Sequence, residues 1–160
     1  MPGREYPARP IVGVGGVLFI DGRVLLAKRR SAPMAGGWSL PGGALEVGET
    51  LAEGLAREMK EETGLDVEAG HVVEVIDRIT RDQEGRVQYH YVLADFICRV
   101  KGGELQADSD ARDARFVPLR ELSSYSIAPI TLEVIHLADQ MWKALRFAPS
   151  SLPPGDISYG

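Results

Sequence analysis

The chain has 160 residues, the size of one ordinary domain, and its 44% hydrophobic and 26% charged residues exclude disordered and fibrous classes. A net charge of -5 gives no support for binding to a nucleic-acid polymer, which normally leaves a basic footprint. The single cysteine cannot form an internal disulfide, and no apolar run is long enough to span a bilayer. We therefore expect a cytoplasmic protein that binds neither a membrane nor a nucleic-acid polymer.

The first elements predicted along the chain form a β-hairpin followed by an irregular loop. Residues 11–20 and 23–29 have the composition of strands, and Asp21-Gly22 between them is typical of a tight hairpin turn. A loop rich in glycine and proline follows, in which residues 38–40 are predicted to form a short strand.

A helix is predicted over Leu51–Thr63. Thr50 and Glu53 have the spacing of a capping box, and Gly64 is suited to end the helix. Gly54 lies inside this helix, where glycine costs about 1 kcal/mol relative to alanine. We expect the preceding loop or a metal-bound ligand to need the space that a side chain at this position would fill.

Two long strands and a second helix are predicted in the rest of the chain. Residues 72–79 and 87–100 read as strands joined by a polar turn, and residues 115–117 read as a short strand. Apolar residues recur at helical spacing over residues 130–147, so we expect a helix that covers the sheet.

These elements indicate one domain over residues 11–147, preceded by an N-terminal segment over residues 1–10. Residues 148–160 are rich in proline, serine and glycine, so we expect a flexible tail or an arm docked on a partner subunit.

Three glutamates of the predicted helix share one face. Glu58, Glu61 and Glu62 are spaced i, i+3 and i+4, which places them within an arc of roughly 100°. Like charges this close oppose folding unless a cation neutralises them, and carboxylates suit Mg²⁺ or Mn²⁺ rather than zinc. The alternative is a solvated helix face with ion pairs from Arg57 to Glu53 and to Glu61.

The segment around these glutamates resembles the signature motif of the Nudix hydrolase family. That motif reads glycine, five residues, glutamate, seven residues, Arg-Glu, an aliphatic residue, any residue, Glu-Glu, any residue, glycine and an aliphatic residue. In this sequence its fixed positions are filled by Gly43, Glu49, Arg57, Glu58, Met59, Glu61, Glu62, Gly64 and Leu65. The resemblance implies an α/β (α+β) fold with a mixed β-sheet sandwiched between α-helices. It also implies Mg²⁺-dependent hydrolysis of a nucleoside diphosphate linked to another moiety.

The resemblance also assigns roles to residues of the motif. Arg57 and Glu49 would orient the metal ligands, and the general base would lie either on the motif helix, at Glu61 or Glu62, or in a later loop. Asp110 is the predicted base of that loop, against the alternative that it is a surface-turn residue. The metal ligands that the resemblance implies are the carboxylates of Glu58, Glu61 and Glu62 and the carbonyl of Gly42.

The substrate is expected to be ADP-ribose or a nucleotide sugar. The chain looks most like this branch of the family in residues 24–30, 38–43 and 103–110. Lys28, Arg29 and Arg30 are expected to hold phosphates or the far end of the substrate, and Trp38 to stack on a base; Tyr89 and Tyr91 are further candidates for stacking. The alternatives are a solvated strand end for the cations and core packing for the aromatic residues.

Two other functions stay open from the sequence. One is a nucleoside triphosphate diphosphatase, which would release pyrophosphate, and the other is a non-catalytic module that binds a nucleotide. A homodimer is expected from the habit of the family. The glycine-rich run over residues 13–16 indicates close strand packing, because no helix follows it to make a dinucleotide site.

Overall fold

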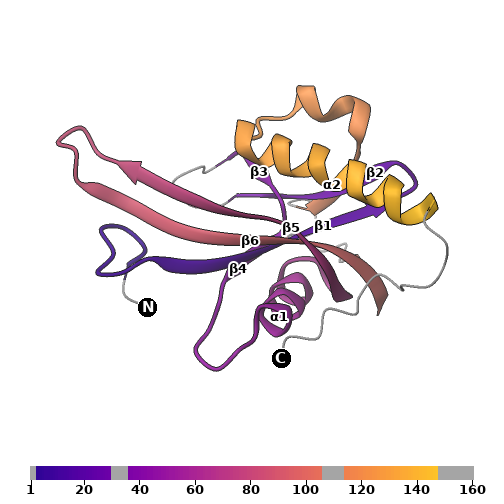
Figure 1. Cartoon of the computed structure of the whole chain (residues 1–160), viewed down its shortest axis with the longest axis horizontal. Helices are drawn as coiled ribbons and strands as arrows, with labels where there is room; N and C mark the ends of the chain where they lie inside the picture. The colour runs from indigo at the N-terminus through magenta and orange to yellow at the C-terminus, as the bar shows by residue number, and fades with distance from the viewer. Residues whose placement is uncertain (1–2, 30–35, 106–113, 148–160) are drawn as a thin grey trace.

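The computed structural model describes residues 3–29, 36–105 and 114–147. Within these residues, four strands precede the first helix and three follow it, and together they build a mixed sheet that carries a helix on each side (Figure 1). The elements are β1 (Ile11–Ile20), β2 (Arg23–Lys28), β3 (Trp38–Ser39), β4 (Gly42–Ala44), α1 (Leu51–Thr63), β5 (Leu65–Arg81), β6 (Val87–Gly103), β7 (Ala114–Pro118), the short 3-10 helix η2 (Leu119–Ser124) and α2 (Pro129–Phe147).

Strand β1 lies at the centre of the sheet and is shared by two sets of strands. The main strand order is β3-β2-β1-β6-β5, while β4 pairs with β1 and β7 pairs with β2. One edge of β1 runs parallel to β6 from Ile11 to Leu18. The other edge pairs with β4 over residues 13–15 and then with β2 over residues 19–20. The sheet therefore divides between β4 and β2.

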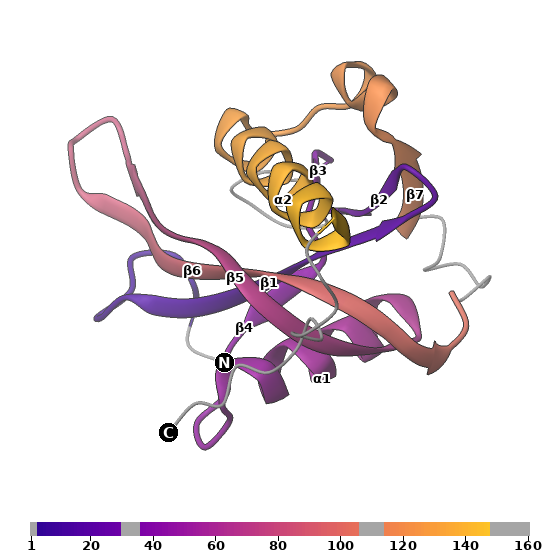
Figure 2. The same ribbon diagram turned by 45° about the vertical axis from the view of Figure 1, so that its right-hand side comes forward.

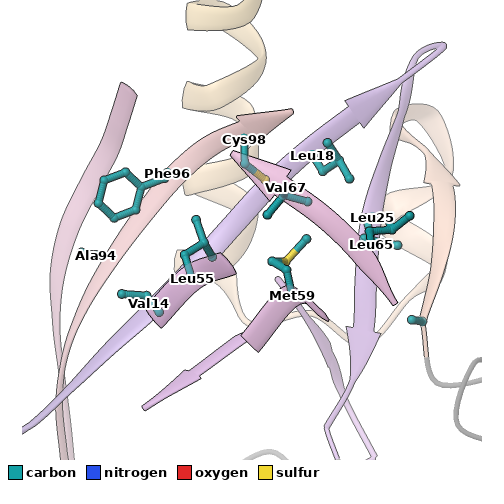
Figure 3. Packing of buried hydrophobic residues seen from close by; sticks show 11 residues of the cluster. Val14, Leu18, Leu25, Leu55, Met59, Leu65, Val67, Ala94, Phe96 and Cys98 are labelled. Atoms are coloured by element: carbon teal, nitrogen blue, oxygen red, sulfur yellow. The ribbon is translucent and has the colours of Figure 1, made fainter. Parts of the chain in front are cut away.

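The two helices cover opposite faces of this sheet, as Figure 2 shows. On one face, Leu55 and Met59 of α1 are fully buried against Val14 and Leu18 of β1 (Figure 3). On the other face, the buried residues of α2 pack in a second cluster with Val17 of β1. The mixed sheet between helices is thus confirmed. Neither helix in the described part of the chain combines the length and apolar character needed to cross a membrane.

Helix α1 has the predicted bounds and the predicted caps. The Thr50 hydroxyl accepts a hydrogen bond from the Glu53 N–H at 3.1 Å, and the Glu53 carboxylate accepts one from the Thr50 N–H at 2.9 Å. Gly64 ends the helix with a φ of 79°, and its N–H donates to the Lys60 carbonyl at 3.0 Å. Local sequence alone therefore fixes this element.

The strands differ from the prediction where pairing overrides local pattern. Strand β5 begins at Leu65 instead of residue 72, because register shifts between Asp66 and Val67 and between Ala69 and Val72 let an irregular segment pair with β6. The sequence did not predict β4, since Gly-Gly-Ala has no strand preference and pairing with β1 creates it.

Close packing of the glycine run on β1 is confirmed at Gly16. A Cβ atom there would lie 3.1 Å from the Cys98 Sγ and 3.3 Å from side-chain atoms of both Leu55 and Met59. Gly16 therefore lets α1 approach the sheet.

Candidate active site

Arg57 is the centre of an ion-pair network that ties α1 to the loop before it. Its Nη1 donates to Glu58 at 2.8 Å and to Glu61 at 3.3 Å, while its Nε and Nη2 donate to the two carboxylate oxygens of Glu49. Nη2 also donates to the Ala44 carbonyl at 3.0 Å. One planar guanidinium thus fixes three acidic side chains and β4 relative to each other.

This network shifts the ionisation of both partners toward their charged forms. The hydrogen bonds from Arg57 lower the pKa of Glu49, and the bonds to Glu49 and then Glu58 raise the pKa of Arg57. The predicted Arg57–Glu61 pair on the helix face is present, whereas Glu53 is engaged in the helix cap. These bonds join α1 to the loop before it, so the acidic cluster is more than a solvated helix face with ion pairs.

Glu62 lies on the other side of the cluster, against β4. Its carboxylate accepts a hydrogen bond from the Gly42 N–H at 3.1 Å. Glu62 as a whole residue is exposed, but its carboxyl group is partly enclosed by protein. This burial raises the pKa of Glu62 to about 7, and the negative charge of Glu58 adds to the shift. Gly42 has a φ of 155°, and a Cβ atom there would collide with the Val14 carbonyl oxygen, so only glycine brings this backbone to the carboxylate.

Two further glycines make room for the cluster. A Cβ atom on Gly43 would lie 2.5 Å from the Glu58 carboxyl carbon. On Gly54 it would lie 2.6 Å from Leu45 Cδ1 and 2.8 Å from Glu49 Oε2, so the preceding loop fills this space. The prediction that the loop needs the space beside Gly54 is confirmed.

The donors of this cluster fit a hard divalent cation, because they are carboxylate and carbonyl oxygens beside glycines that leave them room. Within residues 3–29, 36–105 and 114–147, no group of three acidic, histidine or cysteine side chains forms a finished metal site. The carboxylates of Glu58 and Glu61 instead bond to Arg57, and that of Glu62 bonds to Gly42. A bound cation would replace or share these hydrogen bonds.

A pocket of about 360 Å³ opens beside the cluster, where the sheet divides. Glu61 and Glu62 line it, together with Gly42 and Gly43. Its floor comes from β1 and β6, with side chains from β2 and β5 around it. We call Gly13, Gly15, Leu93 and Asp95 the pocket floor.

Cationic side chains line the same pocket as these acids. Lys28, Arg29 and Arg78 all line it, and none of them has an ion pair with a residue of the described segments. Burial, and then the positive charge of Arg78, lower the pKa of Arg29. The Arg29 Nε and the Tyr91 hydroxyl are buried and find no hydrogen-bond partner among the described residues. These atoms are available to a ligand.

The residues predicted to bind substrate fall in three different places. Lys28 lines the pocket, as does Tyr91. Trp38 is not among the lining residues, because its ring packs edge-on against Tyr125 at 5.5 Å and under the Arg115 guanidinium at 4.7 Å. Arg30 and Asp110 lie outside the described residues. The substrate contacts of Trp38 and Arg30 and the catalytic role of Asp110 therefore stay predictions.

Sequence reasoning missed two charged residues of this pocket, Arg78 and Asp95. Asp95 stands alone in the apolar run over residues 92–98, and it is only 6% exposed. A lone acid inside a buried strand is costly unless something compensates it, and that signal was available in the sequence.

A family model described as the NUDIX domain matches residues 9–138, which is most of the chain. The chain belongs to the Nudix family. A protein from Methanocaldococcus jannaschii named ADP-ribose pyrophosphatase is 42% identical over 71% of this Nudix chain. The match covers 64% of that relative's length, so this chain spans less than two thirds of it.

Solved structures agree with this assignment. The structure of a MutT Nudix hydrolase from Burkholderia pseudomallei has a TM-score of 0.68 at 29% identity, covering 81% of this chain and 98% of that one. An ADP-ribose pyrophosphatase from Streptococcus suis has a TM-score of 0.58 at 28% identity, covering 82% and 92%. Nudix hydrolases generally use a divalent metal, which suits the acidic cluster of this chain.

Proposed function

We propose that this Nudix protein is a hydrolase that cleaves the pyrophosphate bond of a nucleoside diphosphate linked to another moiety. The proposed substrate is ADP-ribose or a nucleotide sugar, with Mg²⁺ as the cofactor and Mn²⁺ as a substitute. The observation that carries this proposal is one pocket lined both by Glu61 and Glu62 and by three cationic side chains, Lys28, Arg29 and Arg78. The likeness to an ADP-ribose pyrophosphatase supports the substrate class.

The acidic cluster supplies the groups that would hold the metal. When bound, a divalent cation neutralises charge on the phosphoryl oxygens and helps to make a water nucleophilic. The proposed ligands are the carboxylates of Glu58, Glu61 and Glu62 and the carbonyl of Gly42.

Arg57 and Glu49 act on these ligands as positioning residues. Arg57 bonds to three carboxylates and a backbone carbonyl, so the orientation of the cluster depends on it. The exposed fraction of its side chain is 24%, and its donors all point at protein oxygens of the cluster and loop. It therefore supports the ligands and does not itself hold a phosphate.

Substrate phosphates would meet the cationic side chains of the same pocket. Arg29 presents a buried Nε with no partner among the described residues, and guanidinium groups bind phosphate oxygens in bidentate geometry. Lys28 is exposed beside it and adds a mobile positive charge. The anionic diphosphate would thus lie between the acidic cluster with its metal and these side chains.

Turnover of a substrate panel tests this function. The panel contains ADP-ribose, nucleotide sugars, NADH and nucleoside triphosphates, assayed with and without Mg²⁺ and with products identified. We expect AMP and ribose 5-phosphate from ADP-ribose. Glu62→Gln should lower kcat by about 100- to 1,000-fold. Glu133→Gln, an exposed residue of α2, is the matched control and should keep full activity.

Other outcomes would assign the protein elsewhere. Pyrophosphate released from triphosphates, with no turnover of ADP-ribose, would make the protein a nucleoside triphosphate diphosphatase. No metal-dependent turnover of any member of the panel would make it a non-catalytic nucleotide-binding module.

We also propose a cytoplasmic homodimer. The buried, unpaired thiol of Cys98 suits a reducing compartment. Val75 and Ile79 are 56% and 50% exposed on the edge strand β5, which gives apolar surface for a second copy. Sedimentation of the full chain measures the oligomeric state.

A further inference from the structure

Asp95 is a buried carboxylate that the proposed chemistry does not use. It lies on β6, is 6% exposed and lines the pocket floor. The described residues provide it with neither a hydrogen bond nor an ion pair, and the nearest compensating charge, Arg78, acts only through space. Burial raises its pKa to about 6. Within the described part of the chain, the cost of burying this group is therefore not offset by a bonded protein partner.

The carboxylate of Asp95 lies in the same row of the sheet as Gly42, whose N–H donates to Glu62. Gly15 pairs with Gly42 on one side and with Asp95 on the other, so these three residues form one row across β4, β1 and β6. A Cβ atom on Gly15 would collide with the Asp95 Oδ1, which means that this carboxylate extends over β1. It therefore lies about one strand spacing, roughly 5 Å, from the backbone of Gly42.

The position and charge of Asp95 determine which part of a substrate it can contact. A carboxylate repels phosphate and accepts hydrogen bonds, so its ligand must offer donors. In a diphosphate-linked sugar, the hydroxyl groups of the sugar esterified to the diphosphate are the nearest donors to the cleaved bond. The base is farther away, and apolar Leu93 and Ile76 line the pocket beyond Asp95.

We infer that Asp95 is a specificity-determining residue that accepts hydrogen bonds from the vicinal hydroxyl groups of the sugar esterified to the diphosphate. Acidic side chains bind ribose hydroxyls in this way in other nucleotide sites. Gly15 is the positioning residue of this contact, because any side chain there would displace the carboxylate. The inference rests on the proposed function, since that function supplies a sugar next to the diphosphate.

Calorimetric binding of four compounds tests this contact in the presence of Mg²⁺. The compounds are AMP and ribose 5-phosphate, each beside its 2-deoxy analogue. We expect the full-length protein to bind at least one hydroxylated compound about 10- to 100-fold more tightly than its deoxy analogue, because hydrogen bonds to charged groups are strong. The pair that shows the difference identifies which of the two sugars of ADP-ribose meets Asp95.

If the inference is right, substitution of Asp95 abolishes the preference for hydroxylated over deoxy compounds. Asp95→Leu keeps a similar size and removes both acceptor oxygens, and Asp95→Ala is a second, smaller variant if the first fails to fold. Asp77→Asn is the matched control, because Asp77 is exposed on β5 and absent from the pocket lining. We expect the Asp95 variants to bind the hydroxylated and deoxy compounds equally, and Asp77→Asn to keep the preference.

The outcomes separate this inference from the proposed function. If Asp95→Leu keeps the hydroxyl preference, or weakens both members of a pair equally, the inference is wrong even when ADP-ribose is hydrolysed. If the wild-type protein shows the preference and Asp95→Leu loses it while no diphosphate is hydrolysed, the sugar contact stands and the proposed reaction is wrong.

Discussion

The two sides of the pocket satisfy their carboxylates in opposite ways. On α1, Glu58 and Glu61 accept hydrogen bonds from Arg57, and Glu62 accepts one from the Gly42 N–H. On β6, Asp95 is more deeply buried and has no protein donor among the described residues. The helix side is therefore oriented before any ligand arrives, whereas the described residues leave the strand side open to the sugar contact that we infer.

This difference distinguishes carboxylates that the protein holds in place from a carboxylate that can hydrogen-bond to a substrate. Groups that must hold a fixed geometry are supported by neighbouring protein groups, as Arg57 supports the acidic cluster. A group that must distinguish one substrate from another works best when its hydrogen bonds are left for the substrate, since an unsuitable substrate then leaves a buried polar group unpaired.

The pH dependence of stability should show that Asp95 lacks a protein partner. Its pKa of about 6 in the folded protein lies above the value of about 4 in an unfolded chain, so the folded state binds this proton more tightly. Its contribution to the free energy of unfolding is greatest below pH 4 and is lost as the pH rises through 6, by on the order of 3 kcal/mol. Denaturant unfolding from pH 4 to pH 8 measures this loss.

The Asp95→Asn variant is the reference for this measurement of stability against pH. Asp95→Asn should remove this part of the pH dependence, whereas Asp77→Asn, at an exposed position, should retain it. Equal pH profiles for wild-type protein and Asp95→Asn would show that a protein group compensates the charge.

Loss of the Arg57 guanidinium should weaken the orientation of the carboxylates in the acidic cluster. Arg57→Lys leaves a point charge that cannot bond to Glu49, Glu58 and the Ala44 carbonyl at once. We expect kcat/KM and the apparent Mg²⁺ affinity to fall about 10- to 100-fold, measured by turnover against Mg²⁺ concentration. Arg99→Lys, which alters an exposed pair with Glu68, is the control. An unchanged Mg²⁺ dependence would exclude Arg57 as a positioning residue.

The smallest expected effect concerns Gly54. A Cβ atom there would press on Leu45 and Glu49, and Glu49 cannot move without weakening its bonds to Arg57. We expect Gly54→Ala to lower the free energy of unfolding by about 1 kcal/mol, because overpacking exceeds the gain in helix propensity. Thermal unfolding and activity measure the effect. A variant that is more stable and fully active would contradict it.

Much of the acidic cluster was predictable because it is local in sequence. The spacing of Glu58, Glu61 and Glu62 places them on one face of any α-helix, and Thr50 and Gly64 set the ends of that helix through contacts within a few residues. The resemblance of this segment to the Nudix motif then indicated its chemistry. Nothing beyond one helix and its preceding loop was needed for either step.

The strand side was not predictable in the same way. Asp95 lines the pocket only because β6 runs parallel to β1, in a register that places Asp95 beside Gly15. Likewise β4 exists because Gly42 pairs with Gly15, and β5 starts early because bulges allow it to pair with β6. Trp38 was expected at the substrate, and its packing on Tyr125 depends equally on partners far along the chain.

By itself the sequence determined the capped helix, its row of glutamates, the first hairpin and the family. Each of these depends on residues a few positions apart, where backbone geometry alone fixes which side chains meet. The tertiary structure alone decided the pocket, its cationic wall and the place of Asp95 on its floor. Strand order and register cannot be read from local pattern, because pairing energies come from segments that are distant in the chain and compete for the same edges.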